Sequence, residues 1–156
     1  MSFEGGCACG AIRYQLTKDP MSVHACHCRD CQRLSGSAFA LNLWIERKFV
    51  ETTGPEPVAY NVPPGSSGKP HDVLACPKCG TGLWNKYHAA PGDVVMVRAG
   101  TLDEPSLVTP DIHIFTRSKV PWLELPKDAR AFDTFYKIDE TWPPESLARW
   151  KALFAA

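Results

Sequence analysis

Seven cysteines constrain this chain of 156 residues more than any other feature. They occur in three groups, with none beyond the last: Cys7 and Cys9; Cys26, Cys28 and Cys31; Cys76 and Cys79. An odd number of cysteines cannot pair completely, and disulfides are rare in a reducing compartment. Because thiols at such short spacing are typical metal ligands, the clusters predict bound metal rather than redox pairs or inert buried thiols.

Length and charge predict one soluble domain spanning residues 1–156. Hydrophobic residues make up 44% of the chain, enough for a core of its own, and no domain linker or internal repeat is visible. Lys plus Arg and Asp plus Glu each total 17, without long runs of one sign, which argues against a nucleic-acid partner. No segment is apolar enough to cross a membrane, and the start "MSFEGGCACG" does not resemble a signal peptide. We therefore expect a cytoplasmic protein without a membrane partner, of unknown oligomeric state.

Alternating apolar and polar residues predict a mostly β fold. The clearest strands are "AIRYQL" at Ala11–Leu16 and "AFALNLWI" at Ala38–Ile45, in which every second residue is apolar. Turn-rich segments with many prolines and glycines separate shorter candidates: Val58–Asn61, Val73–Ala75, Leu83–Asn85, Val94–Ala99 and His113–Phe115.

Two helices are expected beside these strands. A short helix follows Cys28 and ends near Gly36, which can serve as its C-cap. A C-terminal helix from about residue 144 to 154 carries apolar residues at helical spacing, and we expect this face to dock on the core: Leu147, Trp150 and Phe154. We also place the aromatic side chains of Phe115 and Trp122 in the core.

The segment "PPGSSGKP" at Pro63–Pro70 loosely resembles a phosphate-binding loop. Proline occupies the position of the first glycine, and Pro70 stands where a Ser or Thr would bind magnesium. We therefore reject a nucleotide site and expect a flexible connection.

The outer cysteine pairs form two half-sites for one metal ion. In "CPKCG", a two-residue turn followed by glycine allows Cys76 and Cys79 to converge. In "CACG", Cys7 and Cys9 lie two residues apart, and on an extended strand both would project to one face. Joined across the fold, the four thiols would make a closed structural zinc site.

Cys26, Cys28 and Cys31 then remain as a set of three ligands. Three protein ligands with one exchangeable position are typical of catalytic zinc. His24 lies two residues before Cys26 and is the alternative fourth ligand, whereas His27 points away more readily. A different sorting of the seven thiols also stays open.

Polar residues around this set have alternative roles. Arg29 and Arg33 can attract the carboxylate of a peptide-like thiol, although arginines on short helices are more often solvated. Asp30 and Ser35 can bond ligand sulfurs or cap the helix, and we favour capping. His113 is assigned no catalytic role.

The combined motifs resemble the glutathione-dependent formaldehyde-activating enzyme family, which includes centromere-protein-V-like domains. The resemblance covers roughly residues 3–125 and depends on these segments, in order: "CACG", "CHCRDCQRLSGSAFA", "CPKCGTGL" and "HIFTRSKVPW". It implies an Mss4-like β architecture held by zinc. It also implies structural zinc at Cys7, Cys9, Cys76 and Cys79, and activity at Cys26, Cys28 and Cys31.

The same resemblance implies two zinc ions and a carbon–sulfur lyase activity. A small thiol such as glutathione would bind at the open zinc position, lose its proton and add to formaldehyde, giving S-hydroxymethylglutathione. "KPHDVLA" before Cys76 lacks the arginine and aromatic residue we would look for there, so no glutathione-contacting set is assigned. The alternative is a non-catalytic zinc module with both sites structural.

Overall fold

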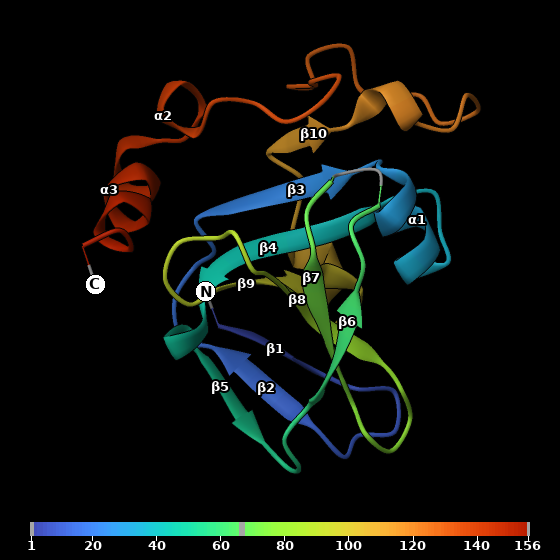
Figure 1. Cartoon of the computed structure of the whole chain (residues 1–156), viewed down its shortest axis with the longest axis vertical. Helices are drawn as coiled ribbons and strands as arrows, with labels where there is room; N and C mark the ends of the chain where they lie inside the picture. Colours follow the sequence, from blue (N-terminus) through green and yellow to red (C-terminus); the bar gives the residue numbers. More distant parts are fainter. Residues whose placement is uncertain (1, 66–67, 156) are drawn as a thin grey trace.

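Two β-sheets make up most of the computed structural model, which describes residues 2–65 and 68–155 (Figure 1). The three-stranded sheet has the order β1-β2-β5, with β1 Phe3–Gly6, β2 Arg13–Leu16 and β5 Val50–Thr53. The larger sheet has the order β10-β3-β4-β9-β8-β7-β6. The strands of this sheet are β3 Ser22–Cys26, β4 Ala40–Glu46, β6 Val58–Val62, β7 His71–Ala75, β8 Gly82–Tyr87, β9 Val94–Arg98 and β10 Ile112–Ile114. The expected mostly β class is confirmed.

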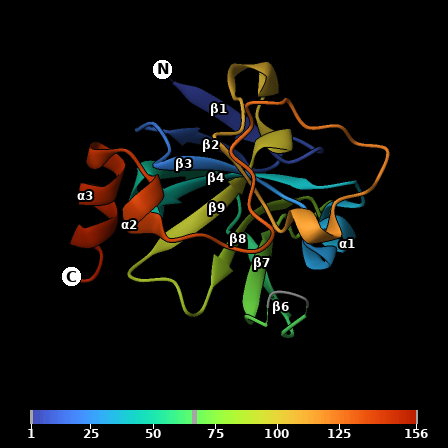
Figure 2. The same ribbon diagram turned by 90° about the horizontal axis from the view of Figure 1, so that it is seen from above.

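Helices are short and lie outside the sheets. The α-helices are α1 Arg29–Ser35, α2 Ile138–Thr141 and α3 Pro144–Ala152; the 3-10 turns are η1 Arg47–Phe49, η2 Ala99–Thr101, η3 Pro105–Leu107 and η4 Thr116–Ser118. Figure 2 shows α1 and α3 at opposite ends of the molecule. None of the described helices is long and apolar enough to cross a bilayer.

One face of the seven-stranded sheet packs against the three-stranded sheet. Apolar side chains of both sheets form a buried cluster, including Tyr14 and Leu16 from β2 and Leu43, Ile45 and Val97 from β4 and β9. Strand periodicity produces this layer, because alternate residues of β4 and β9 point to the same face. The predicted strand Ala38–Ile45 is thus confirmed as β4, a central strand.

The opposite face carries a second apolar cluster. It contains Cys26, Cys28 and Cys31 together with Met96 and Trp142, so the middle cysteine group belongs to this face. The C-terminal segment with α2 and α3 lies on this side of β3 and β4, away from the three-stranded sheet (Figure 1). Strand β10 adds parallel to β3 and extends the sheet beneath that segment.

An ion pair fastens α3 to the sheet. The Arg149 guanidinium donates from Nε to Oε1 of Glu46 on β4 at 3.0 Å, and both side chains are largely buried. Trp150 packs on Trp44 and Trp142, as the predicted docking face requires. The helix ends at Ala152 rather than at residue 154, however, and Phe154 is 66% exposed.

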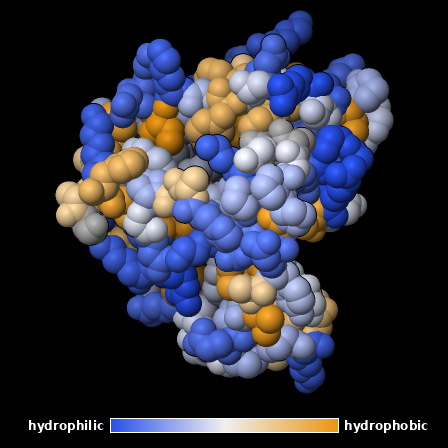
Figure 3. Space-filling view, viewed as in Figure 1, coloured by the Kyte–Doolittle hydropathy of each residue, from blue (hydrophilic) through white to orange (hydrophobic). Residues whose placement is uncertain are grey.

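The core assignment of Trp122 is wrong. Trp122 is 73% exposed in an irregular segment after η4. Phe115 is partly buried against the second cluster, as expected. Other exposed apolar residues occur in small groups on the face shown in Figure 3, among hydrophilic residues.

Candidate metal centres

Two turns of similar geometry carry the outer cysteines. The Cys7 N–H donates to the Ile12 carbonyl at 3.0 Å, and the Cys76 N–H donates to the Thr81 carbonyl at 3.0 Å, so each turn spans six residues. The prediction that Cys7 and Cys9 lie on an extended strand is wrong: both lie in the turn between β1 and β2. The turn arises because Gly10 adopts a positive φ of 74°, which glycine adopts without strain.

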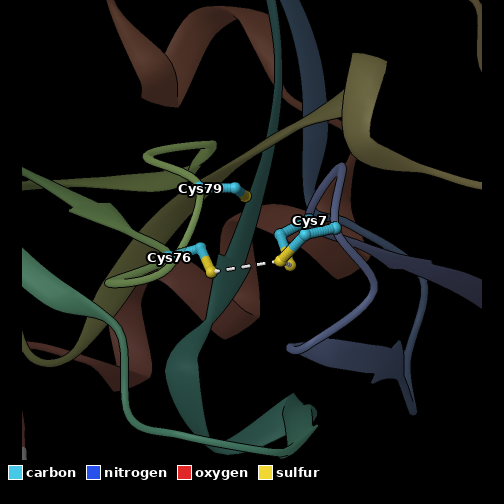
Figure 4. Close-up of side chains that lie close together, drawn as sticks. Cys7, Cys76 and Cys79 are labelled. Atoms are coloured by element: carbon cyan, nitrogen blue, oxygen red, sulfur yellow. Dashed lines mark hydrogen bonds between the residues drawn. The ribbon is translucent and has the colours of Figure 1, made fainter.

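The four outer sulfurs converge between these turns, as predicted (Figure 4). All four lie within 4.8 Å of one another, with Cys7 and Cys9 at 3.5 Å and Cys9 and Cys76 at 3.9 Å. Zinc–sulfur bonds of about 2.3 Å in a tetrahedron place the sulfurs about 3.8 Å apart. The donor set therefore fits a tetrahedral thiolate-binding metal ion.

Hydrogen bonds from Thr81 favour the thiolate of Cys79. The Thr81 hydroxyl lies 3.1 Å from the Cys79 sulfur, and this bond and the Thr81 backbone N–H lower the pKa of Cys79 to about 5. The same hydroxyl accepts the Ala8 N–H at 3.1 Å, which joins the two turns. At Cys9 the Ala11 N–H acts to lower the pKa, but burial and three neighbouring thiols raise it to about 11. Four adjacent thiols cannot all ionise without a cation between them.

The middle cysteines meet where β3 ends and α1 begins. Cys26 is the last residue of β3, Cys28 is the N-cap of α1, and the Cys28 sulfur accepts the Cys31 N–H at 3.3 Å. The three sulfurs lie within 4.8 Å of one another, and all three side chains are buried. The structure thus brings the predicted set of three together.

Protonation in this cluster also indicates a cation site. Hydrogen bonds with Cys28 and Cys31, followed by burial, raise the pKa of Cys26 far above its ordinary value. At Cys31 the bond with Cys26 lowers the pKa, but Cys28 and burial raise it to about 11. Without a cation Cys26 and Cys31 stay protonated, whereas a divalent metal compensates for the loss of these protons.

His24 belongs to an aromatic pocket rather than to the sulfur cluster. Its Nε2 lies 2.6 Å from the Tyr136 hydroxyl, and its ring packs on Trp44 and Trp142. Burial lowers its pKa to about 3, so the ring is neutral. Among the residues that the structure describes, no histidine or carboxylate joins the three sulfurs. His27, between two ligands, instead places Nε2 3.1 Å from Nδ1 of His113.

Two of the predicted polar residues of α1, Arg29 and Ser35, form hydrogen bonds with groups other than the sulfurs. Arg29 bonds Gln32, Arg33 is exposed, and Ser35 donates to the Cys31 carbonyl at 2.7 Å. Asp30 is not the N-cap, because Cys28 takes that place. A Cβ on Gly65 would lie 2.0 Å from Asp30 Oδ1, so the β6–β7 connection packs against α1 there. The remainder of the rejected phosphate loop, residues 66 and 67, lies outside the described residues.

Sequence reasoning missed a group of polar residues on β7, β8 and β9. Register pairs Cys26 with Ala40, Asn42 with Arg98, Met96 with Asn85, and Tyr87 with His71. Directly paired residues and alternate residues of a strand share one face of a sheet. These polar side chains therefore share the face that carries Cys26: His71, Asn85, Tyr87 and Arg98.

The nearby thiols affect this polar group. Burial, then Cys31, Cys26 and Cys28, raises the pKa of the Tyr87 phenol well above its ordinary value, so Tyr87 stays protonated. His71 stacks on Tyr87 at 4.5 Å between ring centroids. The signal that could have found the group is a polar residue at an inward position of an apolar strand, as in "LWNKY" and "VVMVR".

The chain was compared with family models, curated proteins and solved structures. The family model described as glutathione-dependent formaldehyde-activating enzyme matches residues 2–118. A Halomonas elongata protein, provisionally named a glutathione-dependent formaldehyde-activating enzyme, is 26% identical over 156 residues, which cover 97% of this chain and 96% of that protein. A crystal structure of a Rhodobacter sphaeroides protein aligns with a TM-score of 0.48 and 17% identity, over 69% of this chain and 91% of the other.

Proposed function

Because the chain belongs to the glutathione-dependent formaldehyde-activating enzyme family, we propose that it catalyses addition of a small thiol such as glutathione to formaldehyde or a related carbonyl compound. A carbon–sulfur bond forms between the thiol sulfur and the carbonyl carbon, and the thiol proton is transferred to the carbonyl oxygen. The product with formaldehyde is S-hydroxymethylglutathione, and the reverse reaction is that of a carbon–sulfur lyase.

The observation that carries this proposal is the incomplete donor set at the middle cluster. Cys26, Cys28 and Cys31 supply three sulfurs, and the described histidines and carboxylates add no fourth ligand. A zinc ion held there would supply positive charge that lowers the pKa of a thiol at its fourth position. The outer set of four thiols has no such position and is assigned to structural zinc: Cys7, Cys9, Cys76 and Cys79.

The chain contributes burial and orientation to this chemistry. The cysteine side chains are 4%, 1% and 2% exposed, which limits access of water to the reacting sulfur. The Cys31 N–H bond to Cys28 fixes one ligand by the backbone of α1. The neutral Tyr87 phenol is a hydrogen-bond donor on the same face as the cluster.

Cobalt substitution tests the proposal directly. We expect glutathione to change the visible absorption of cobalt at the middle cluster with one equivalent per chain, and S-methylglutathione to cause no change. The matched variant Cys28→Ala loses this response. Isotope-exchange NMR with labelled formaldehyde then measures whether adduct formation exceeds the rate without protein.

Absence of any spectral response to thiols would reject the mechanism and favour the alternative, a non-catalytic module with two structural zinc ions. That alternative also predicts that Cys28→Ala unfolds the protein as completely as Cys79→Ala. A folded Cys28→Ala protein lacking one metal ion contradicts it.

A further inference from the structure

Arg98 is the last residue of β9, on the face that carries the middle cysteines. Its Nη1 donates to the Asn42 side-chain oxygen at 3.0 Å, and this bond orients the guanidinium. Its Nη2 is buried and has no hydrogen-bond partner among the described residues. A buried charged donor without a partner costs free energy, so its position calls for a ligand-based explanation.

No carboxylate of the chain neutralises Arg98 in the described structure. The ion pairs found there involve other basic residues, including Arg13 with Asp103 and Arg149 with Glu46. A second polar atom on the same face, the Asn85 side-chain oxygen, is also buried without a partner among the described residues, and Asn85 is 2% exposed. This face therefore presents a cation and a hydrogen-bond acceptor that the described part of the chain does not satisfy.

Arg98 lines a cavity next to the three-thiol cluster. The cavity has a volume of about 480 Å³, and its other walls include Ser35, Phe39, Ala40 and Val73. Ala40 is the register partner of Cys26, and the Ser35 hydroxyl bonds the Cys31 carbonyl. The cavity thus borders α1, which holds Cys31, and β4, the strand that pairs with β3 at Cys26, and its size is typical of a site for a small molecule.

We propose that Arg98 binds a carboxylate of the thiol substrate in this cavity and thereby selects thiols that carry a carboxylate, such as peptide-like thiols, over neutral thiols. The inference rests on the proposed function, because it takes the substrate sulfur to be at Cys26, Cys28 and Cys31. A guanidinium N–H donates to a carboxylate oxygen in a strong, charge-assisted hydrogen bond. Apolar walls at Phe39 and Val73 contact the rest of the ligand.

Binding measurements on the zinc-loaded protein test this assignment. Calorimetry compares glutathione, glutathione diethyl ester and 2-mercaptoethanol on the wild type, Arg98→Met and Arg98→Lys. Loss of a hydrogen bond between charged groups predicts that Arg98→Met weakens glutathione binding about 10- to 100-fold, with smaller effects on the ester and the neutral thiol. Arg13→Met, which removes an exposed arginine from β2 of the three-stranded sheet, is the matched control and leaves the affinities unchanged.

Two results overturn the assignment: equal binding of glutathione and its diethyl ester by the wild type, or unchanged glutathione binding by a folded Arg98→Met protein. The wild-type ester comparison decides the matter even if the variant does not fold. Failure of the proposed function is a different result, since the wild type would then bind none of the three thiols.

Discussion

The two cysteine clusters differ in how the chain assembles them. The outer cluster joins two turns that are far apart in sequence, and two of its four sulfurs belong to exposed residues, Cys9 and Cys79. The middle cluster comes from Cys26 to Cys31 alone, and every member is buried. A set of four from two rigid turns is suited to fastening the fold, whereas a buried set of three leaves room for a ligand.

The two clusters also differ in the hydrogen bonding of the polar groups around them. Thr81 and the backbone of the two turns satisfy the outer sulfurs and join the turns to each other. On the sheet face that carries the middle cluster, His71, Asn85 and Arg98 each have a buried polar atom without a hydrogen-bond partner among the described residues. Complete local bonding is typical of a structural site, and unsatisfied polar groups are typical of a binding site.

The largest expected effect separates the clusters by stability. Cys76→Ser removes a ligand that joins the two turns, and a structural zinc site contributes on the order of 10 kcal/mol to folding, so we expect an unfolded protein. Cys28→Ala is the matched variant: we expect it to stay folded and to hold one metal ion fewer. Circular dichroism measures whether each variant is folded, and metal analysis measures how many ions it holds. If both variants were equally unfolded, the outer and middle clusters would not differ as structural and ligand-binding sites.

The next effect concerns the C-terminal segment with α2 and α3, which packs over the face that carries the middle cluster (Figure 1). Arg149→Met leaves the buried Glu46 carboxylate without its partner, which costs about 3 kcal/mol. Burial acts to raise the pKa of Glu46, but the Arg149 bonds hold it below 4.5. This contribution is therefore present above pH 4.5 and is lost as the pH falls through the lowered pKa.

Urea unfolding of Arg149→Met and the wild type across that pH range provides the measurement. Lys137→Met, which removes an exposed pair with Glu140, is the control and has little effect. An unchanged free energy of unfolding in Arg149→Met would show that docking of the C-terminal segment does not depend on the Arg149–Glu46 ion pair.

A smaller effect tests the bonding around the outer cluster. Thr81→Val removes the hydroxyl that contacts the Cys79 sulfur and the Ala8 N–H, and we expect metal affinity at this cluster to fall about 10- to 100-fold. Competition with a chelator measures it. Thr116→Val loses a hydroxyl that donates to the Phe132 carbonyl and serves as control. Weakened metal binding at the middle cluster instead would contradict the assignment.

The smallest effect lies in a turn. Gly80 has a φ of 76° with open space around it, so Gly80→Ala costs about 1–2 kcal/mol from backbone conformation alone. Gly100 also has open space but no positive φ, and Gly100→Ala is expected to change stability little. Thermal unfolding compares the stability of Gly80→Ala with that of Gly100→Ala. Equal losses of stability in the two variants would contradict the explanation from backbone conformation.

Strand prediction worked best where the sequence shows a period of two. Arg13–Leu16 alternates in burial, and the alternate apolar residues Leu41, Leu43 and Ile45 of β4 pack in one cluster. Every residue of β3 is buried, because other parts of the chain cover both faces, so "SVHAC" shows no period of two. Strands β1 ("FEGG") and β5 ("VETT") each contain one large apolar residue, so the sequence shows no alternation there.

Aromatic residues show the same limit. Trp150 and Trp122 look alike in sequence, yet the first packs against Trp44 and the second is exposed. Hydrophobicity alone does not say which side chain reaches a covered face.

Cysteine spacing alone determined that the thiols occur in two pairs and one group of three, because a short spacing keeps sulfurs close whatever surrounds them, and the fold brought the two pairs together as a set of four. Only the tertiary structure decided what lies beside them. The Tyr136 hydroxyl forms a hydrogen bond with His24, and aromatic rings surround the His24 side chain. Strands distant in sequence place Arg98 and Asn85 on the sheet face that carries Cys26. Such neighbours depend on strand order and register, which local spacing does not encode.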